Sequence, residues 1–195
     1  MLSIIDDSLI LAKPIPNGFT YTLASRLGQM LNMAEQDFGP RDKTFTILGI
    51  EFRDGVPQSW FPCNCGHVVI QLSREAMQDP NRAFFQLAHE CIHLLDPCPG
   101  GTNKLEEGVA THFALCFMKN MGVSYTTGDE RYDKACCLVK QLLGKNPQVI
   151  KDLRKKFGPL RNITKEQIMG ACPTLYPGVA QELTAPFCAK EMSEQ

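Results

Sequence analysis

The sequence predicts an α+β fold in which a small mixed or antiparallel sheet lies between an N-terminal helix and a longer helical part. Two segments rich in β-branched and aromatic side chains, 44–52 and 67–73, predict strands, and apolar residues recur at helical spacing on both sides of them. The length of 195 residues is that of one domain. We therefore expect a single domain, 1–195, with a core at about 18–122 and a helical C-terminal extension at about 123–195.

The composition excludes several classes of protein. Hydrophobic residues make up 44% and charged residues 21%, which are the fractions of a folded globular chain. Every apolar run is shorter than the ~18–20 residues that span a bilayer, and two acids stand where a signal peptide carries lysine or arginine. A net charge of −1 gives no general attraction to nucleic acid. The nine cysteines are odd in number and irregularly spaced, which favours reduced thiols and a cytoplasmic protein.

The first predicted elements are a helix and two strands. Apolar residues recur at helical spacing over 18–38, and a Gly-Pro pair then ends the helix. Residues 44–52 (TFTILGIEF) predict a strand, and the Asp54-Gly55 dipeptide after it is typical of a hairpin turn. Residues 67–73 (HVVIQLS) predict a further strand, which is either an ordinary member of the sheet or an edge that receives an extended peptide.

The rest of the chain is predicted to be helical. Asp79, followed by a proline, is a good cap for a helix that runs to Leu95. After a tight loop, Asn103 and Glu106 form a capping pair for a second helix, which Gly122 ends. Further helices are predicted at about 129–143, 147–157 and 165–170.

One segment carries an evident chemical motif, His89-Glu90-Cys91-Ile92-His93, an H-E-x-x-H sequence. Residues four apart share one face of a helix, so both imidazoles can bind a single zinc ion. Glu90 can then lie beside the open coordination position and take a proton from water. Both histidines fall on the polar side of a half-buried helix, where a cleft is expected. The plainer interpretation is a surface helix with two solvated histidines.

A catalytic zinc site has a third protein ligand, and Glu107 on the following helix is the leading candidate. It shares a helix face with Ala110 and Ala114, whose small side chains allow the preceding helix to approach closely. Metzincins are excluded, because Asp96 and Pro99 stand where that class has its glycine and third histidine. The rivals for the third ligand are Glu106, which is better used in the helix cap, Asp96 in the loop, and His112.

The two helices together resemble a known family. Residues 84–93 (FFQLAHECIH) followed by 106–114 (EEGVATHFA) are similar to the ImmA/IrrE family of metallopeptidases, whose helices read approximately RFTLAHELGH and EEEANRFA. The resemblance covers about residues 67–118 and is specific at the motifs. Thr111 stands where the family usually has asparagine, and a threonine hydroxyl can also orient an imidazole.

The resemblance implies a gluzincin-like zinc peptidase domain with one zinc ion per chain, held by His89, His93 and Glu107, and with Glu90 as the catalytic base. The implied function is that of an intracellular zinc metalloendopeptidase acting on a protein or peptide. Family members often cleave a helix-turn-helix repressor, which would be a separate partner because no such motif is evident in this chain. The alternative is a zinc-binding regulatory or partner-binding module that has the peptidase fold but no turnover.

Three further features are left open by the sequence. Cys63, Cys65 and His67 alternate, so an extended chain would put them on one face as a second metal site, or they are small residues near a sheet edge. Residues 140–165 carry an excess of lysine and arginine, which indicates solvated helix faces or a docking surface for an acidic partner or nucleic acid. Candidates for an oxyanion donor are Tyr125, Tyr132, Tyr176 and His67.

Overall fold

Two small sheets near the N-terminus and eight α-helices make up the part of the chain that the computed structural model describes, residues 5–187. The α+β class is therefore confirmed. The chain divides into two compact units, Met1–Pro99 with Ala110–Gly128, and Gly100–Val109 with Asp129–Gln195. Helix α4 (Lys104–Asn120) is continuous and contributes residues to both units. The single-domain organisation stays a prediction.

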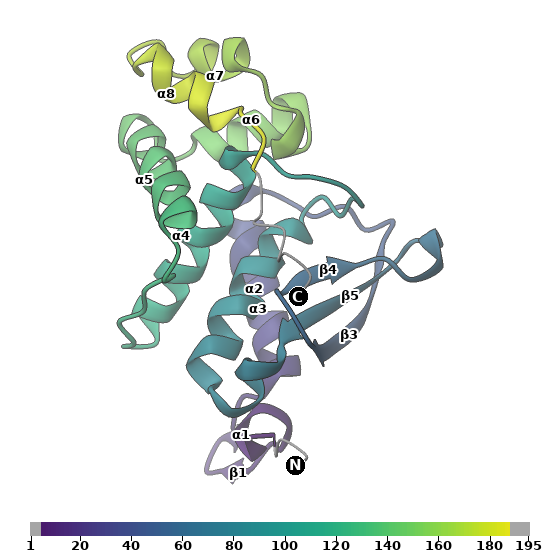
Figure 1. Ribbon diagram of the computed structural model, residues 1–195. Helices are drawn as coiled ribbons and strands as arrows, with labels where there is room; N and C mark the ends of the chain where they lie inside the picture. The colour runs from purple at the N-terminus through teal and green to yellow at the C-terminus, as the bar shows by residue number, and fades with distance from the viewer. Residues whose placement is uncertain (1–4, 188–195) are drawn as a thin grey trace, which may run out of the picture. The chain divides into compact units, whose positions relative to one another are not determined.

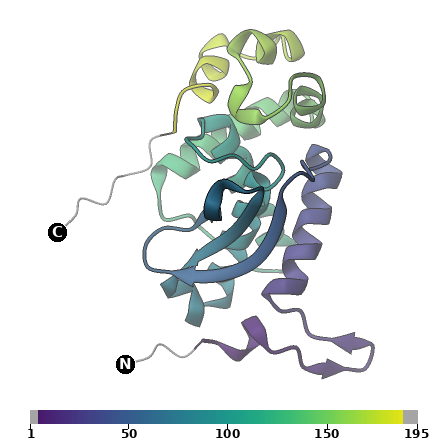
Figure 2. The same ribbon diagram turned by 90° about the vertical axis from the view of Figure 1, so that its right-hand side faces the viewer.

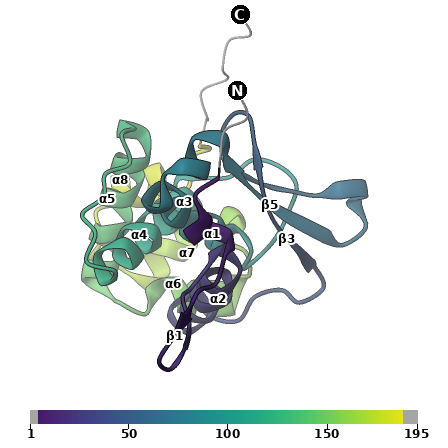
Figure 3. The ribbon, with the colours of Figure 1, turned by 90° about the horizontal axis from the view of Figure 1, so that it is seen from below.

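The N-terminal helix is shorter than predicted because a small hairpin precedes it. Gly18 and Phe19 pair with Ile15 and Pro14, so the helix begins only at Leu23. α1 packs against α2, and Figure 3 shows α1 and β1 nearest to the viewer. The elements of this region are α1 (Asp7–Ile10), β1 (Pro14–Ile15), β2 (Gly18–Phe19) and α2 (Leu23–Phe38).

The larger sheet consists of β3 (Thr46–Arg53), β4 (Gln58–Trp60) and β5 (His67–Ser73) in the order β3-β5-β4. β5 runs parallel to β3 and antiparallel to β4, so the sheet is mixed. The hairpin predicted at Asp54-Gly55 is wrong, because the strands before and after this turn both pair with β5 and not with each other.

Of the two roles left open for residues 67–73, the structure shows the ordinary member of the sheet and not the peptide-accepting edge, because β5 is the central strand and both of its edges are hydrogen-bonded. Its alternate residues Val68, Ile70 and Leu72 are completely buried. A strand this apolar is stabilised most at the centre of a sheet, where it loses the most surface to its neighbours. In the described part of the chain the edge strands are β3 and β4.

One face of this sheet is covered by helices, as Figures 1 and 2 show together. Helix α3 (Pro80–His93) packs on β5 and β4, and α2 packs on α3. The other face carries a chain of amide hydrogen bonds, in which Gln58 Nε2 donates to Gln71 Oε1 and Gln71 Nε2 donates to Glu51 Oε1, both at 2.6 Å. α3 is therefore held with its apolar side against the sheet.

The start of α3 is as predicted, and its end comes slightly earlier. The Asp79 carboxylate accepts the backbone N–H of Arg82 at 3.1 Å, and a proline occupies the first helical turn. The helix ends at His93 rather than Leu95, and the N–H of Leu94 still donates to the carbonyl of Glu90. The predicted apolar face is confirmed by the burial of Phe84, Leu87, Ala88 and Cys91.

The second unit is helical. Three of its helices were predicted, whereas α8 was not, because its proline-rich sequence reads as a loop although Pro177 only occupies the tolerated first turn. Neighbouring helices pack in pairs, α5 with α6 and α8, and α7 with α6 and α8. The bounds are α5 (Glu130–Lys145), α6 (Val149–Phe157), α7 (Lys165–Ala171) and α8 (Pro177–Leu183). Among the described residues, no helix has the length and apolar character needed to span a bilayer.

The first turns of α4 lie unusually close to α5. A Cβ atom added at Gly108 would lie 2.5 Å from the Ala135 carbonyl oxygen and 2.6 Å from Val139 Cγ2. Such distances are far below van der Waals contact, so the two backbones can approach this closely only because residue 108 has no side chain.

Gly108→Ala is therefore expected to destabilise the protein by about 1–3 kcal/mol through overpacking, even though alanine favours a helix more than glycine does. Urea unfolding followed by circular dichroism measures the change. Gly144→Ala, in α5 with open space around it, is the matched control and should leave stability unchanged or raise it by up to about 1 kcal/mol. Equal behaviour of the two variants would contradict the close approach.

Candidate metal centre

The two histidines of the H-E-x-x-H sequence lie one turn apart near the end of α3. Their Nε2 atoms are 3.3 Å from each other, and both side chains are half-buried. Because α3 is fixed against the sheet by its apolar side, the imidazoles of His89 and His93 lie on the side that does not face β5. The i, i+4 spacing thus directs both ring nitrogens to one point in space.

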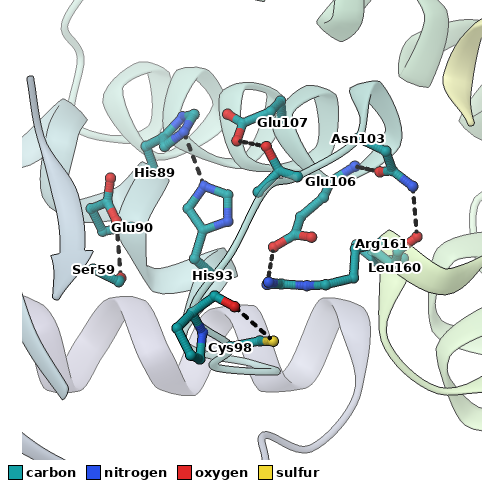
Figure 4. A network of polar contacts seen from close by, with 12 residues as sticks. Ser59, His89, Glu90, His93, Cys98, Asn103, Glu106, Glu107, Leu160 and Arg161 are labelled. Carbon is teal, nitrogen blue, oxygen red and sulfur yellow. Dashed lines mark hydrogen bonds and ion pairs between the residues drawn. The ribbon is translucent and has the colours of Figure 1, made fainter. Parts of the chain in front are cut away.

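Glu107 joins these histidines. One ligand atom from each of His89, His93 and Glu107 lies within 4.8 Å of the other two, and together they form a group that could hold a metal ion. Figure 4 shows the three side chains turned toward one another. Glu107 is carried by the first turn of α4, which continues without a break into Ala110–Asn120, and its residue is only 6% exposed.

The donor set and the spacing suit zinc. Two imidazole nitrogens and one carboxylate oxygen are the protein ligands of one class of catalytic zinc site. Zn–N bonds of about 2.0–2.1 Å at tetrahedral angles separate two nitrogens by about 3.3–3.4 Å. The 3.3 Å between the Nε2 atoms of His89 and His93 matches this separation. The two histidines therefore fit one shared metal ion, and the Glu107 oxygen lies within 4.8 Å of both of their ligand atoms.

Glu90 lies beside the histidines but is not a member of the metal-holding group. Its residue is 4% exposed, and its Oε2 accepts a hydrogen bond from the Ser59 hydroxyl at 3.0 Å (Figure 4). Ser59 belongs to the edge strand β4, so this bond joins the candidate base to that strand. Sequence reasoning did not find Ser59, because no local pattern relates residues 31 positions apart.

The first turn of α4 is secured by several hydrogen bonds. Asn103 Oδ1 accepts the N–H of Glu106 at 2.9 Å, which confirms the predicted cap, and Asn103 Nδ2 donates to the Leu160 carbonyl at 3.1 Å. The Thr102 hydroxyl donates to Glu107 Oε1 at 2.6 Å. Hydrogen bonds therefore hold both the backbone of this helix terminus and the carboxylate of the candidate ligand Glu107.

The side chain of Glu106 has a different role from the one predicted. Its carboxylate pairs with the guanidinium of Arg161 at 2.6 Å, and the two side chains are 4% and 11% exposed. The sequence assigned Glu106 to the helix cap alone, whereas the structure makes it half of a nearly buried ion pair. Arg161 comes from the basic segment 140–165, so at least this positive charge is used inside the protein and does not form part of a docking surface.

The other rivals of Glu107 do not belong to the group either. Among the described residues, the His89, His93 and Glu107 set is the one group of three side chains that could hold a metal ion. His112 Nε2 instead lies 3.7 Å from the Cys116 sulfur. Asp96 lies in the loop after α3 and is half-buried. The helical register that favoured Glu107 over its neighbours is thus consistent with the structure, and metal binding itself stays a prediction.

The second metal site considered at Cys63, Cys65 and His67 does not form. The chain turns at Cys63 and Asn64, where φ is 58° and 47°, so these residues are not on one extended face. Cys65 Sγ lies 3.0 Å from His67 Nδ1, but the three residues do not form a metal-holding group. None of the eight described cysteines forms a disulfide with another described residue, and Cys188 lies outside the described residues.

The candidates for an oxyanion donor have contacts of their own. The ring of Tyr125 stacks on Phe85 with centroids 4.4 Å apart, and burial raises its pKa above the ordinary value, so its phenol stays protonated. Tyr132 packs against Phe187, and Tyr176 is 75% exposed. These contacts give no reason to assign the role to any of them.

Two buried residues complete the description of α3 and α4. The Thr111 hydroxyl is fully buried and has no hydrogen-bond partner among the described residues, so it does not orient an imidazole here as the sequence suggested. Burial, and then the charge of Glu90, raises the pKa of the Cys91 thiol well above its usual value. Cys91 therefore stays a protonated core residue and not a competing ligand.

Comparison with known proteins adds no relative. No family model, curated protein or solved structure matches this chain. The resemblance to the ImmA/IrrE metallopeptidases therefore rests on two observations, the sequences of α3 and α4 and the metal-holding group that residues of these helices form.

The Glu106–Arg161 pair leads to a stability prediction. Glu106→Gln or Arg161→Met leaves the partner charge buried without its counter-charge, which should cost about 3–5 kcal/mol of unfolding free energy. The double variant removes both charges and should lose less than either single variant. Urea unfolding of all three proteins forms a double-mutant cycle.

The exposed Asp54–Arg74 pair provides the control. Its side chains are 76% and 56% exposed, so Asp54→Asn should leave the unfolding midpoint almost unchanged. Zinc binding by folded Glu106→Gln should weaken far less than that of Glu107→Ala, because Glu106 lies outside the metal-holding group and affects the ligand only through the backbone of the helix. Losses that add independently in the double variant would show that the pair is not coupled.

Proposed function

We propose that this protein is a zinc-dependent metallopeptidase that hydrolyses peptide bonds in a protein substrate. The single observation that supports this most is the convergence of His89, His93 and Glu107, with Glu90 one residue from the first ligand. An H-E-x-x-H helix with a carboxylate from the next helix is the ligand set of gluzincin peptidases, the class to which the resemblance points.

His89, His93 and Glu107 would hold the ion, which leaves one tetrahedral position for water or substrate. A zinc ion at such a site supplies Lewis acidity toward a carbonyl oxygen and lowers the pKa of water. The protein's own contribution is geometric: α3 fixes the two imidazoles, and α4 fixes the carboxylate.

Glu90 is the proposed general base. It would accept a proton from the attacking water and return it to the leaving amine. Its near-complete burial excludes most competing solvent, and the hydrogen bond from Ser59 holds its carboxylate in one orientation. Because this bond takes up only one of the two oxygens, the other remains able to accept a proton.

The substrate would bind as an extended peptide along β4. In the described sheet β4 pairs with β5 on one side only, so its other edge can accept the backbone of a further strand. Ser59 belongs to β4 and contacts Glu90, so a peptide on this edge would run beside the candidate base. The resemblance makes a helix-turn-helix repressor the first class of substrate to assay.

The metal site is tested by the zinc content of the purified wild-type protein and its variants. Purified wild-type protein should carry about one zinc ion per chain by mass spectrometry of the metal, and His89→Ala, His93→Ala and Glu107→Ala should each carry little, because two ligands hold zinc much more weakly than three. His112→Ala, also on α4, is the control and should keep its zinc. Undiminished zinc in the three ligand variants would refute the site.

Catalysis is tested separately at Glu90. Glu90→Gln should keep zinc and fold while cleavage of a substrate falls by at least about a hundredfold, because the amide accepts no proton. Glu130→Gln, an exposed residue at the start of α5, is the control and should cleave normally. A zinc-loaded wild type that cleaves no candidate substrate would favour the regulatory module without turnover over the peptidase.

A further inference from the structure

We infer that Thr102 is a positioning residue for the third metal ligand: its hydroxyl holds one oxygen of Glu107 so that the other oxygen is presented to the ion. This inference rests on the metal site of the proposed function, but it does not need the site to cleave peptides. It concerns a residue that lies outside both sequence motifs.

The contact between the two side chains is short and sheltered. Thr102 Oγ1 donates to Glu107 Oε1 at 2.6 Å, at the strong end for a hydroxyl–carboxylate hydrogen bond. Glu107 is 6% exposed and Thr102 is half-buried, so little water competes for the bond. A glutamate side chain otherwise has three rotatable bonds, and ordering them on metal binding costs free energy. The hydrogen bond orders the carboxylate before the ion arrives.

Thr102 is itself fixed by its backbone. The N–H of Phe187 donates to the Thr102 carbonyl at 2.9 Å, and the N–H of Lys104 donates to the Ala185 carbonyl at 3.0 Å. Between them Asn103 forms an antiparallel bridge with Pro186. The segment before α4 is thus hydrogen-bonded to residues about 80 positions further along the chain, which gives the hydroxyl a defined place from which to hold Glu107.

The chemistry of a carboxylate explains what the hydrogen bond does. Each oxygen of the Glu107 carboxylate has two lone pairs, so a donor on Oε1 is compatible with metal binding by the same carboxylate. Carboxylates that bind metals are commonly hydrogen-bonded in this way, and loss of such a partner typically weakens metal affinity about 10–100-fold.

The test compares zinc affinities of the full chain. Thr102→Val keeps the size and branching of the side chain but removes the hydroxyl, whereas Thr102→Ser keeps the hydroxyl. Competition with a chromophoric chelator should give a zinc dissociation constant raised about 10–100-fold for Thr102→Val and within about threefold of wild type for Thr102→Ser. The matched control is Thr184→Val, whose hydroxyl donates to the Ala180 and Gln181 carbonyls in the same unit.

Two further measurements separate positioning from general stability. Thermal unfolding of the metal-free proteins should give similar midpoints for Thr102→Val and Thr184→Val, while only Thr102→Val loses affinity. The visible spectrum of the cobalt(II)-loaded protein should change in Thr102→Val and not in Thr184→Val, because only the former alters the coordination of Glu107.

The outcomes are distinct. Wild-type affinity in Thr102→Val, or equal losses in the valine and serine variants, would overturn the role of the Thr102 hydroxyl while leaving the metal site in place. A wild type that binds no zinc would overturn both the metal site and this inference. Zinc binding that depends on Thr102 without any cleavage by the wild type would overturn the peptidase function and support the inference.

Discussion

The placement of Glu107 depends on how the first turn of α4 is held, and a main constraint there is the nearly buried ion pair between Glu106 and Arg161. An ion pair removed from water is stabilising only when the two charges face each other, because a buried charge without its counter-charge costs unfolding free energy. Arg161 therefore fixes Glu106, and the helix then fixes the direction of the next residue. Asn103 adds the helix cap and a bond to the Leu160 carbonyl.

The same turn shows how two adjacent carboxylates acquire different roles. Successive residues of a helix point about 100° apart, so Glu106 and Glu107 face different neighbours. One meets an arginine, and the other meets two imidazoles and the Thr102 hydroxyl. The absence of a side chain at Gly108 lets α5 approach immediately beyond them. Structural and candidate functional residues thus occupy three consecutive positions.

The sheet contributes by placing one strand beside the end of α3. Because the apolar strand β5 takes the centre, the short strand β4 becomes an edge, and its Ser59 reaches Glu90. The bond gives the buried carboxylate a polar partner, which reduces the cost of its burial. The sheet therefore supports α3 with its covered face and meets the candidate base with its edge strand.

Local chemistry by itself determined the helices that carry the site. Asp79 followed by proline sets the start of α3, the i, i+4 spacing brings His89 and His93 together, and helix periodicity separates Glu107 from Glu106. These features depend on residues a few positions apart, and backbone geometry decides them. Only the tertiary structure decided the rest: the central position of β5, the pairing of Glu106 with Arg161, and the bond from Ser59 to Glu90. Each of these joins distant residues, and the competition among strands and charges for buried partners decides which contacts form.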